Sequence, residues 1–128
     1  MQRGVDVAVH TAPVGKAADR YRALVAEVRR SGHLWVLSHP AEEAWATYSD
    51  PRGHVVVPVW PGQDQAAAMA TGLWGGLRPT AIPLDAFLAH EVPGLEAEGV
   101  LIAAHPTRTS SGAAVRATHF ARALLDAS

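Results

Sequence analysis

The sequence contains no cysteine, which excludes disulfide bridges, thiolate zinc sites and a cysteine nucleophile. It contains a single lysine, Lys16, beside ten arginines. Basic and acidic residues nearly cancel to a net charge of -1, so no overall field attracts nucleic acid or an anionic membrane. No apolar run is long enough to span a bilayer, and Asp6 and His10 interrupt the segment where a signal peptide would have its apolar core. We therefore expect a cytoplasmic protein, and the arginine and alanine bias suggests a bacterial one.

What the chain does contain is enough apolar sequence for one core. Its 128 residues are 48% hydrophobic and 18% charged, which excludes an intrinsically disordered chain and predicts one domain. The unusual feature is tryptophan, with four residues against two each of phenylalanine and tyrosine.

Apolar periodicity predicts helices over residues 16–30, 63–71, 84–91 and 118–126. Residues 93–94 (PG) are expected to end the third helix. Short β-branched or apolar runs predict strands at the following places: 33–38, 44–48, 54–60, 79–82, 99–105 and 113–115.

The clustering of these strands predicts an α+β fold, with about four helices on a mostly antiparallel or mixed sheet. Tight turns between the strands of residues 33–60 favour a three-stranded antiparallel meander. Residues 16–128 are predicted to form the domain, and residues 1–15 an N-terminal arm or edge strand. The alternating residues 5–9 of that segment could also pair across a homodimer, so the oligomeric state stays open.

The order of several short motifs resembles the uncharacterised bacterial family labelled domain of unknown function 2750. The motifs run from residue 21 onward: residues 35–37 (WVL), 43–45 (EAW), 57–61 (VPVWP), 79–84 (PTAIPL), Phe87, 93–95 (PGL), Gly99 and 105–107 (HPT). Ala44 and His105 depart from the family pattern, which has a glycine and an aromatic residue there. The resemblance implies a small α+β domain and carries no activity with it.

The tryptophans define the candidate binding site. Trp35, Trp45 and Trp60 fall on the predicted meander, and Trp74 lies in a glycine-flanked loop. They form either an aromatic wall for a ligand or partner, or core packing beneath the helices. The pattern leaves both interpretations open.

Catalytic and metal signals are weak. No histidine pair has the spacing of a helical zinc site, no GxSxG elbow is present, and no phosphate loop is found, so we expect no metal and no cofactor. His105, at the exit of the most apolar strand, and His54 are the candidates for an acid or base. Arg108 lies in a polar loop over residues 106–116 that is suited either to holding an anion or to being an ordinary exposed hairpin loop.

Two functional hypotheses follow. The first is a non-catalytic binding module whose tryptophan-bearing sheet and loop hold a protein, a peptide or a small apolar ligand. The second is a small enzyme, as in specialised metabolism, with a tryptophan-lined pocket and a histidine acid or base.

Overall fold

The computed structural model describes residues 15–41 and 44–126 of the chain. The predicted arm over residues 1–14, and with it the predicted strand and dimer contact at residues 5–9, lie outside the described residues. Among the described residues, no helix is both long enough and apolar enough to cross a membrane.

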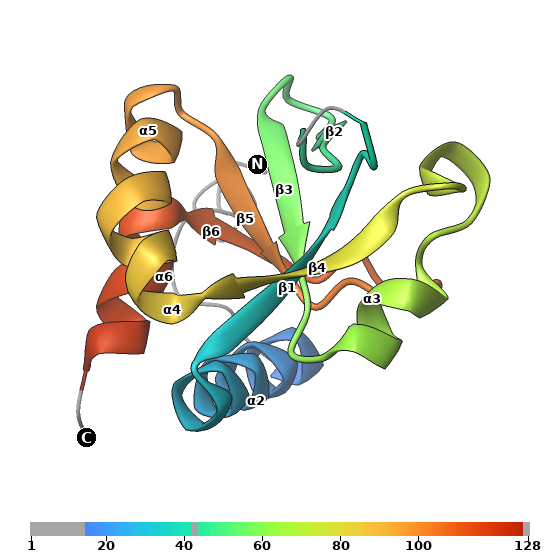
Figure 1. The fold of residues 1–128 in the computed structure, drawn as a ribbon. Helices are drawn as coiled ribbons and strands as arrows, with labels where there is room; N and C mark the ends of the chain where they lie inside the picture. Colours follow the sequence, from blue (N-terminus) through green and yellow to red (C-terminus); the bar gives the residue numbers. More distant parts are fainter. Residues whose placement is uncertain (1–14, 42–43, 127–128) are drawn as a thin grey trace.

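Two sheets form the centre of the domain (Figure 1). The larger has the order β2-β3-β5-β6, with bounds Tyr48–Ser49, Val55–Val59, Leu101–Ala104 and Ala113–Arg116. β3 and β5 pair in parallel and the other pairs are antiparallel, so this sheet is mixed. All four residues of β5 are buried, as predicted for a central strand.

The smaller sheet pairs β1 (His33–Ser38) with β4 (Arg78–Pro83) along the whole length of both strands. This pairing corrects the predicted meander. β2 and β3 do form an antiparallel pair, but β1 meets the following segments only through single bridges, from Trp35 to Trp60 and from Ser38 to Trp45. β4 pairs with one edge of β1 along its whole length, and the other edge is divided between Trp60 and residues 44–46.

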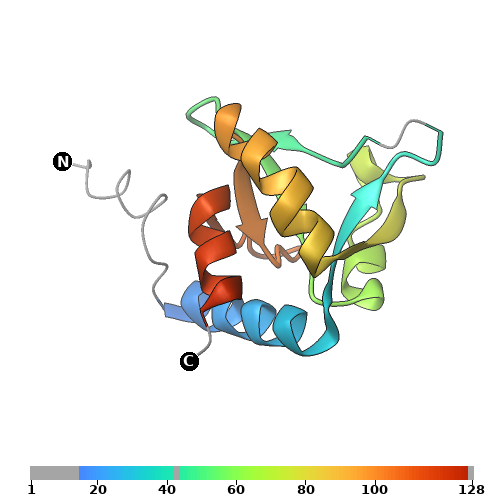
Figure 2. The same cartoon turned by 60° about the vertical axis from the view of Figure 1, so that its left-hand side comes forward.

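Three helical segments pack against the same side of the sheets (Figure 2): α2 (Gly15–Ser31), α6 (Ala117–Leu125) and the continuous run from α4 to α5. α2 forms because Tyr21, Leu24 and Val28 share one helical face, and all three are buried in the main core. Gly32 ends this helix with a φ of 81°, as the Ser31-Gly32 pair predicts. α3 (Gln63–Ala68) and the short 3-10 turn η1 (Gly72–Trp74) lie on the opposite face of β1, where Ala66 and Trp74 pack with Leu37.

The sequence predicts that the helix after β4 stops at Pro93, but in the structure the helix continues. It runs through α4 (Leu84–Ala86), a wide π turn η2 (Phe87–Glu91) and α5 (Val92–Ala97). The amide of Val92 donates to the carbonyl of Phe87, five residues earlier. Pro93 then falls in the first turn of α5, where a missing amide donor is tolerated.

These elements confirm the predicted α+β fold with a mixed and antiparallel sheet arrangement. The alternation of side chains along β1 divides its contacts between two clusters. Leu34 and Val36 enter the main core, and Leu37 enters a second cluster. We call this second group the tryptophan cluster: Leu37, Ala46, Trp60 and Ala66, with Trp35, Met69, Ala70, Trp74 and Leu77 packed against them.

Candidate functional site

Three of the four tryptophans pack together in the tryptophan cluster. Trp35 and Trp60 exchange both backbone hydrogen bonds, at 3.0 and 2.9 Å. Trp60 is fully buried, and its indole Nε1 donates to the carbonyl of Pro106 at 2.9 Å. The Trp74 ring meets Trp60 edge-on at a centroid distance of 6.2 Å. Trp60 is therefore closed to any ligand, whereas Trp74 contributes to a shallow cavity of about 360 Å3 beside Leu73.

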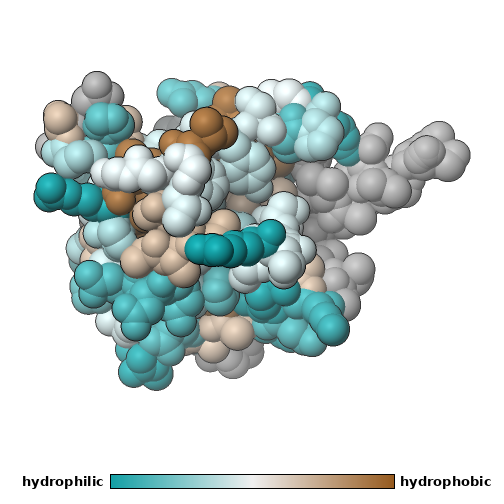
Figure 3. All heavy atoms as spheres, turned by 90° about the vertical axis from the view of Figure 1, so that its right-hand side faces the viewer, coloured by the Kyte–Doolittle hydropathy of each residue, from teal (hydrophilic) through white to brown (hydrophobic). Residues whose placement is uncertain are grey.

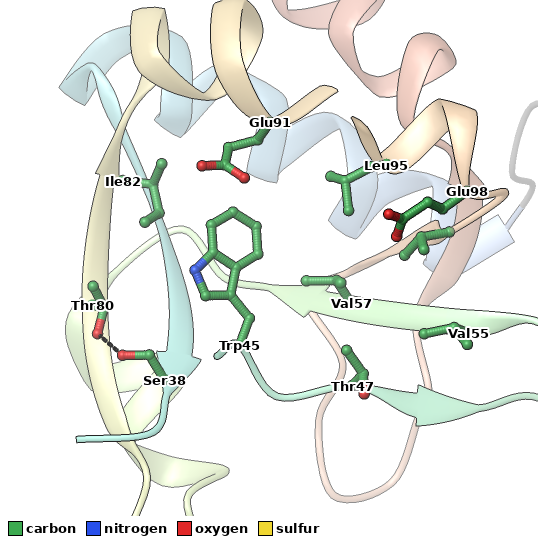
Figure 4. Close-up of a pocket in the computed structure, with 11 residues that line it drawn as sticks. Ser38, Trp45, Thr47, Val55, Val57, Thr80, Ile82, Glu91, Leu95 and Glu98 are labelled. Carbon is green, nitrogen blue, oxygen red and sulfur yellow. Dashed lines mark hydrogen bonds between the residues drawn. The ribbon is translucent and has the colours of Figure 1, made fainter. Parts of the chain in front are cut away.

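Trp45 lies apart from the others and projects into a cleft between the two sheets and the α4–α5 run (Figure 4). The volume of this cleft is about 560 Å3, within the usual range of small-molecule sites. We call it the Trp45 cleft, and these residues line it: Ser38, Trp45, Thr47, Val55, Val57, Thr80, Ile82, Glu91, Leu95, Glu98 and Val100.

The backbone at Trp45 explains why its side chain separates from the cluster. The segment lies antiparallel to the end of β1, with the Ala46 amide bonded to the Leu37 carbonyl at 2.7 Å. Because successive side chains of an extended segment point to opposite faces, Ala46 enters the tryptophan cluster and Trp45 turns to the other side. The indole is half-buried and packs against the edge of the main core.

One helical face supplies two carboxylates to the cleft. Glu91, Leu95 and Glu98 are four and three residues apart, a spacing that places them on one side of a helix, and all three line the cavity. Figure 4 shows the Glu91 carboxylate on the helix side of the indole, and Glu98 farther along the same wall. Neither carboxylate has a hydrogen bond or an ion pair with any part of the chain that the structure describes.

A pair of hydroxyl groups forms the wall made by β1 and β4. Ser38 and Thr80 lie within hydrogen-bond distance, with their oxygens 2.5 Å apart, and the Thr80 hydroxyl also donates to the carbonyl of Arg78 at 3.1 Å. A hydroxyl has one hydrogen to donate. Whichever of the two hydroxyls donates to the other, the Ser38 oxygen keeps a lone pair that can accept a hydrogen bond from a group in the cleft.

A protein-family model described as "Protein of unknown function (DUF2750)" matches residues 21–124. The chain belongs to the DUF2750 family. This confirms the resemblance carried by the sequence motifs, and the matched span contains every residue that lines the Trp45 cleft. Neither the curated proteins nor the solved structures include a match to the chain.

The two candidate histidines of this DUF2750 domain lie outside the Trp45 cleft. His54 sits in the turn before β3, where its Nδ1 lies 3.0 Å from a carboxylate oxygen of Asp50. Partial burial opposes ionisation of Asp50, but hydrogen bonds from His54 and from the Arg52 amide outweigh it and lower the pKa of this carboxyl. His54 also borders a separate cavity of about 330 Å3, together with the Glu96–Arg116 ion pair.

His105 follows β5 with a φ of 51°, a left-handed conformation that is uncommon for a residue other than glycine. Its amide donates to the carbonyl of Val59 at 2.8 Å, which anchors this conformation. Burial, and then the positive charge of Arg20, lower the pKa of His105. Burial and the neighbouring Arg20 charge thus favour the neutral form of this side chain.

The loop around Arg108 makes a tight turn closed by a bridge between Thr107 and Ser110. Arg108 is exposed at its tip. The Ser110 hydroxyl accepts a hydrogen bond from Arg20 on α2, and Arg116 turns away to pair with Glu96. The structure therefore distributes these predicted anion-holding groups over two places.

Sequence reasoning missed Glu91 and Glu98 as site residues. The signal was their helical spacing with Leu95, but Pro93 and Gly94 between them predicted a break in the helix. Within residues 15–41 and 44–126, no group of three or more histidine, aspartate or glutamate side chains is placed to hold a metal ion.

Proposed function

We propose that this DUF2750 domain is a non-catalytic binding module that encloses the apolar part of a small ligand in the Trp45 cleft. The observation that carries the proposal is the half-buried indole at the centre of a cavity of about 560 Å3. An aromatic ring on such a wall gives a ligand a large apolar contact at little cost in side-chain entropy, because the surrounding core already holds the ring.

A small ligand fits the surface better than a large protein partner does. The exposed large apolar residues of the described chain are Val55, Leu73 and Leu125, and they belong to three separate elements. On the face that carries α3 and η1, strongly hydrophobic atoms form small, broken groups among hydrophilic ones (Figure 3). A stable protein interface usually has a larger continuous apolar centre.

Binding also fits the cleft better than catalysis by a histidine acid or base does. The lining includes no histidine among the described residues, so the alternative of an enzyme using His54 or His105 in a tryptophan-lined pocket gains no support there. We retain the bacterial cytoplasm as the proposed setting, on the composition of the chain.

The proposal is tested with the neutral probe phenethyl alcohol. Titration of the isotopically labelled protein, followed by NMR, should shift the indole N–H signal of Trp45, with a Kd of about millimolar for so small a probe. Trp45→Ala should abolish saturable binding, which in this variant is followed by the backbone amide signals of Thr47 and Val57 because the indole is gone. Trp74→Ala is the matched control, because it removes an indole from the other cavity and should leave the titration unchanged. Equal binding by the Trp45→Ala variant would contradict the proposed site.

A further inference from the structure

The polar groups of the Trp45 cleft have an unbalanced charge. Two carboxylates, Glu91 and Glu98, line it, and no lysine, arginine or histidine is among the described residues of its wall. Elsewhere on the same helix, Glu96 is paired with Arg116 and Thr118. The two cleft carboxylates are therefore distinguished by the lack of a partner in the described chain, and not by their position on an acidic helix.

The other polar groups agree with this charge. The Ser38 hydroxyl oxygen, hydrogen-bonded to Thr80, keeps a lone pair that can accept a hydrogen bond from a ligand. The face of an indole ring carries the negative part of the aromatic quadrupole and attracts cations. Carboxylate, hydroxyl oxygen and indole face thus converge on one cavity, and each of them favours a positively charged hydrogen-bond donor.

From this convergence we infer that the ligand of the Trp45 cleft is a small amphipathic amine, with an apolar or aromatic body and a protonated amino group. The inference deepens the proposed function and rests on it. The apolar body packs among Trp45, Ile82 and Val57, and the ammonium group lies between the indole and Glu91. An amine supplies the missing positive charge and donates to carboxylate and hydroxyl oxygens.

The charge of the cleft also argues against the other ligand classes of similar shape. A carboxylate or phosphate of the same size would face Glu91 and Glu98 without a compensating cation. A neutral alcohol would gain the apolar contact alone. Among probes that share one aromatic body, we therefore expect the amine to bind most tightly, the alcohol less tightly and the carboxylate most weakly.

The experiment compares phenethylamine, phenethyl alcohol and phenylacetate on the full chain at neutral pH, each followed by the NMR signal of the Trp45 indole N–H. The amine should bind about tenfold more tightly than the alcohol, which is the size of one charge-assisted contact, and phenylacetate should bind most weakly. Raising the ionic strength should weaken the binding of the amine and leave the binding of the alcohol unchanged.

Glu91→Gln keeps the size of the side chain and removes its charge, so it should reduce the preference for the amine to about twofold or less. Glu98→Gln should reduce it by a smaller factor, because this residue is the more exposed of the two. Glu27→Gln is the matched control: it removes the same charge from an exposed pair with Arg30 on α2 and should leave the preference at about tenfold.

The outcomes separate the two proposals. If the amine and the alcohol shift Trp45 with equal affinity, or if Glu91→Gln keeps the tenfold preference, the amine inference is wrong and the binding module stands. If phenylacetate binds most tightly, the inference is likewise overturned. If none of the three probes shifts Trp45, the proposed function fails and the inference fails with it.

Discussion

The tryptophan cluster and the Trp45 cleft use the same residue type in opposite ways. In the cluster, the Trp60 indole is fully buried and its N–H has a carbonyl partner in Pro106. In the cleft, the Trp45 indole is half-buried and shares the cavity with carboxylates, hydroxyls and apolar side chains. The two positions lie on segments that each bridge to β1, at Trp35 and at Ser38. A tryptophan becomes a candidate ligand contact where its side of the chain opens on a cavity, as at Trp45, and a core residue where neighbouring segments cover it, as at Trp60.

The largest expected effect is on stability, which should fall more when the Trp60 indole is removed than when the Trp45 indole is removed. Trp60→Ala should lower the free energy of unfolding by about 3–5 kcal/mol, because it leaves a cavity and an unpaired Pro106 carbonyl. Trp45→Ala should lower it by about 1–2 kcal/mol, because only part of that side chain leaves water on folding. Urea unfolding followed by far-ultraviolet circular dichroism measures both. Equal losses at the two positions would break the distinction between a closed cluster and an open cleft.

The next effect concerns the loop that closes the cluster. Gly112 has a φ of 79°, and a Cβ there would lie 2.5 Å from the carbonyl oxygen of Ala104. Gly112→Ala should therefore destabilise the domain by about 2–3 kcal/mol, through backbone strain and this clash together.

Gly53→Ala provides the control for that variant. Gly53 has a similar φ of 88° with nothing within 4 Å of the added Cβ, so only the strain of about 1 kcal/mol should appear. Probe binding at Trp45 should be unchanged in both variants at a temperature where they are folded. A Gly112→Ala domain as stable as the Gly53→Ala domain would show that the loop adjusts.

The smallest expected effect is the difference in stability between removing the charge of Glu96 and removing that of Glu91, two carboxylates of the same helical run. The hydrogen bond from the Arg116 side chain lowers the pKa of Glu96, against partial burial and with help from Thr118. A carboxyl with a lowered folded pKa stabilises the fold above its ordinary pKa, and that contribution disappears as the pH falls through the lowered value.

Glu96→Gln should therefore lower the free energy of unfolding by less than about 1 kcal/mol at neutral pH, as expected for an ion pair that solvent reaches. Below the folded pKa of Glu96, the substitution should not change the free energy of unfolding. Glu91→Gln should leave the free energy of unfolding within about 0.5 kcal/mol at neutral pH, because that carboxylate has no described partner to lose. Unfolding curves at a series of pH values measure the first effect. A cost of Glu96→Gln that persists at low pH would assign it to packing instead of charge.

Much of the fold was predictable because its signals are local. The stripe of Tyr21, Leu24 and Val28 predicts α2, and the run of small and branched apolar residues before His105 predicts β5. The pairing of β1 with β4 was not predictable, because Val36 and its partner Thr80 are 44 positions apart in the sequence and no local pattern encodes that register. The helix through Pro93 was missed because proline ends most helices, and only the π turn before it makes room for this one.

The candidate site divides in the same way. All four tryptophans were identifiable from the sequence, and Trp45 was among the predicted ligand contacts. The sequence by itself determined the residue types and the helical and strand periods, whereas the face shared by Glu91, Leu95 and Glu98 required the helix to continue through Pro93. The tertiary structure decided which tryptophan faces a cavity and what lies opposite it, because those contacts join β1, β3, β4 and α5 from distant parts of the chain. Long-range contacts of this kind are set by the packing of the whole core, whereas periodicity is set by each segment alone.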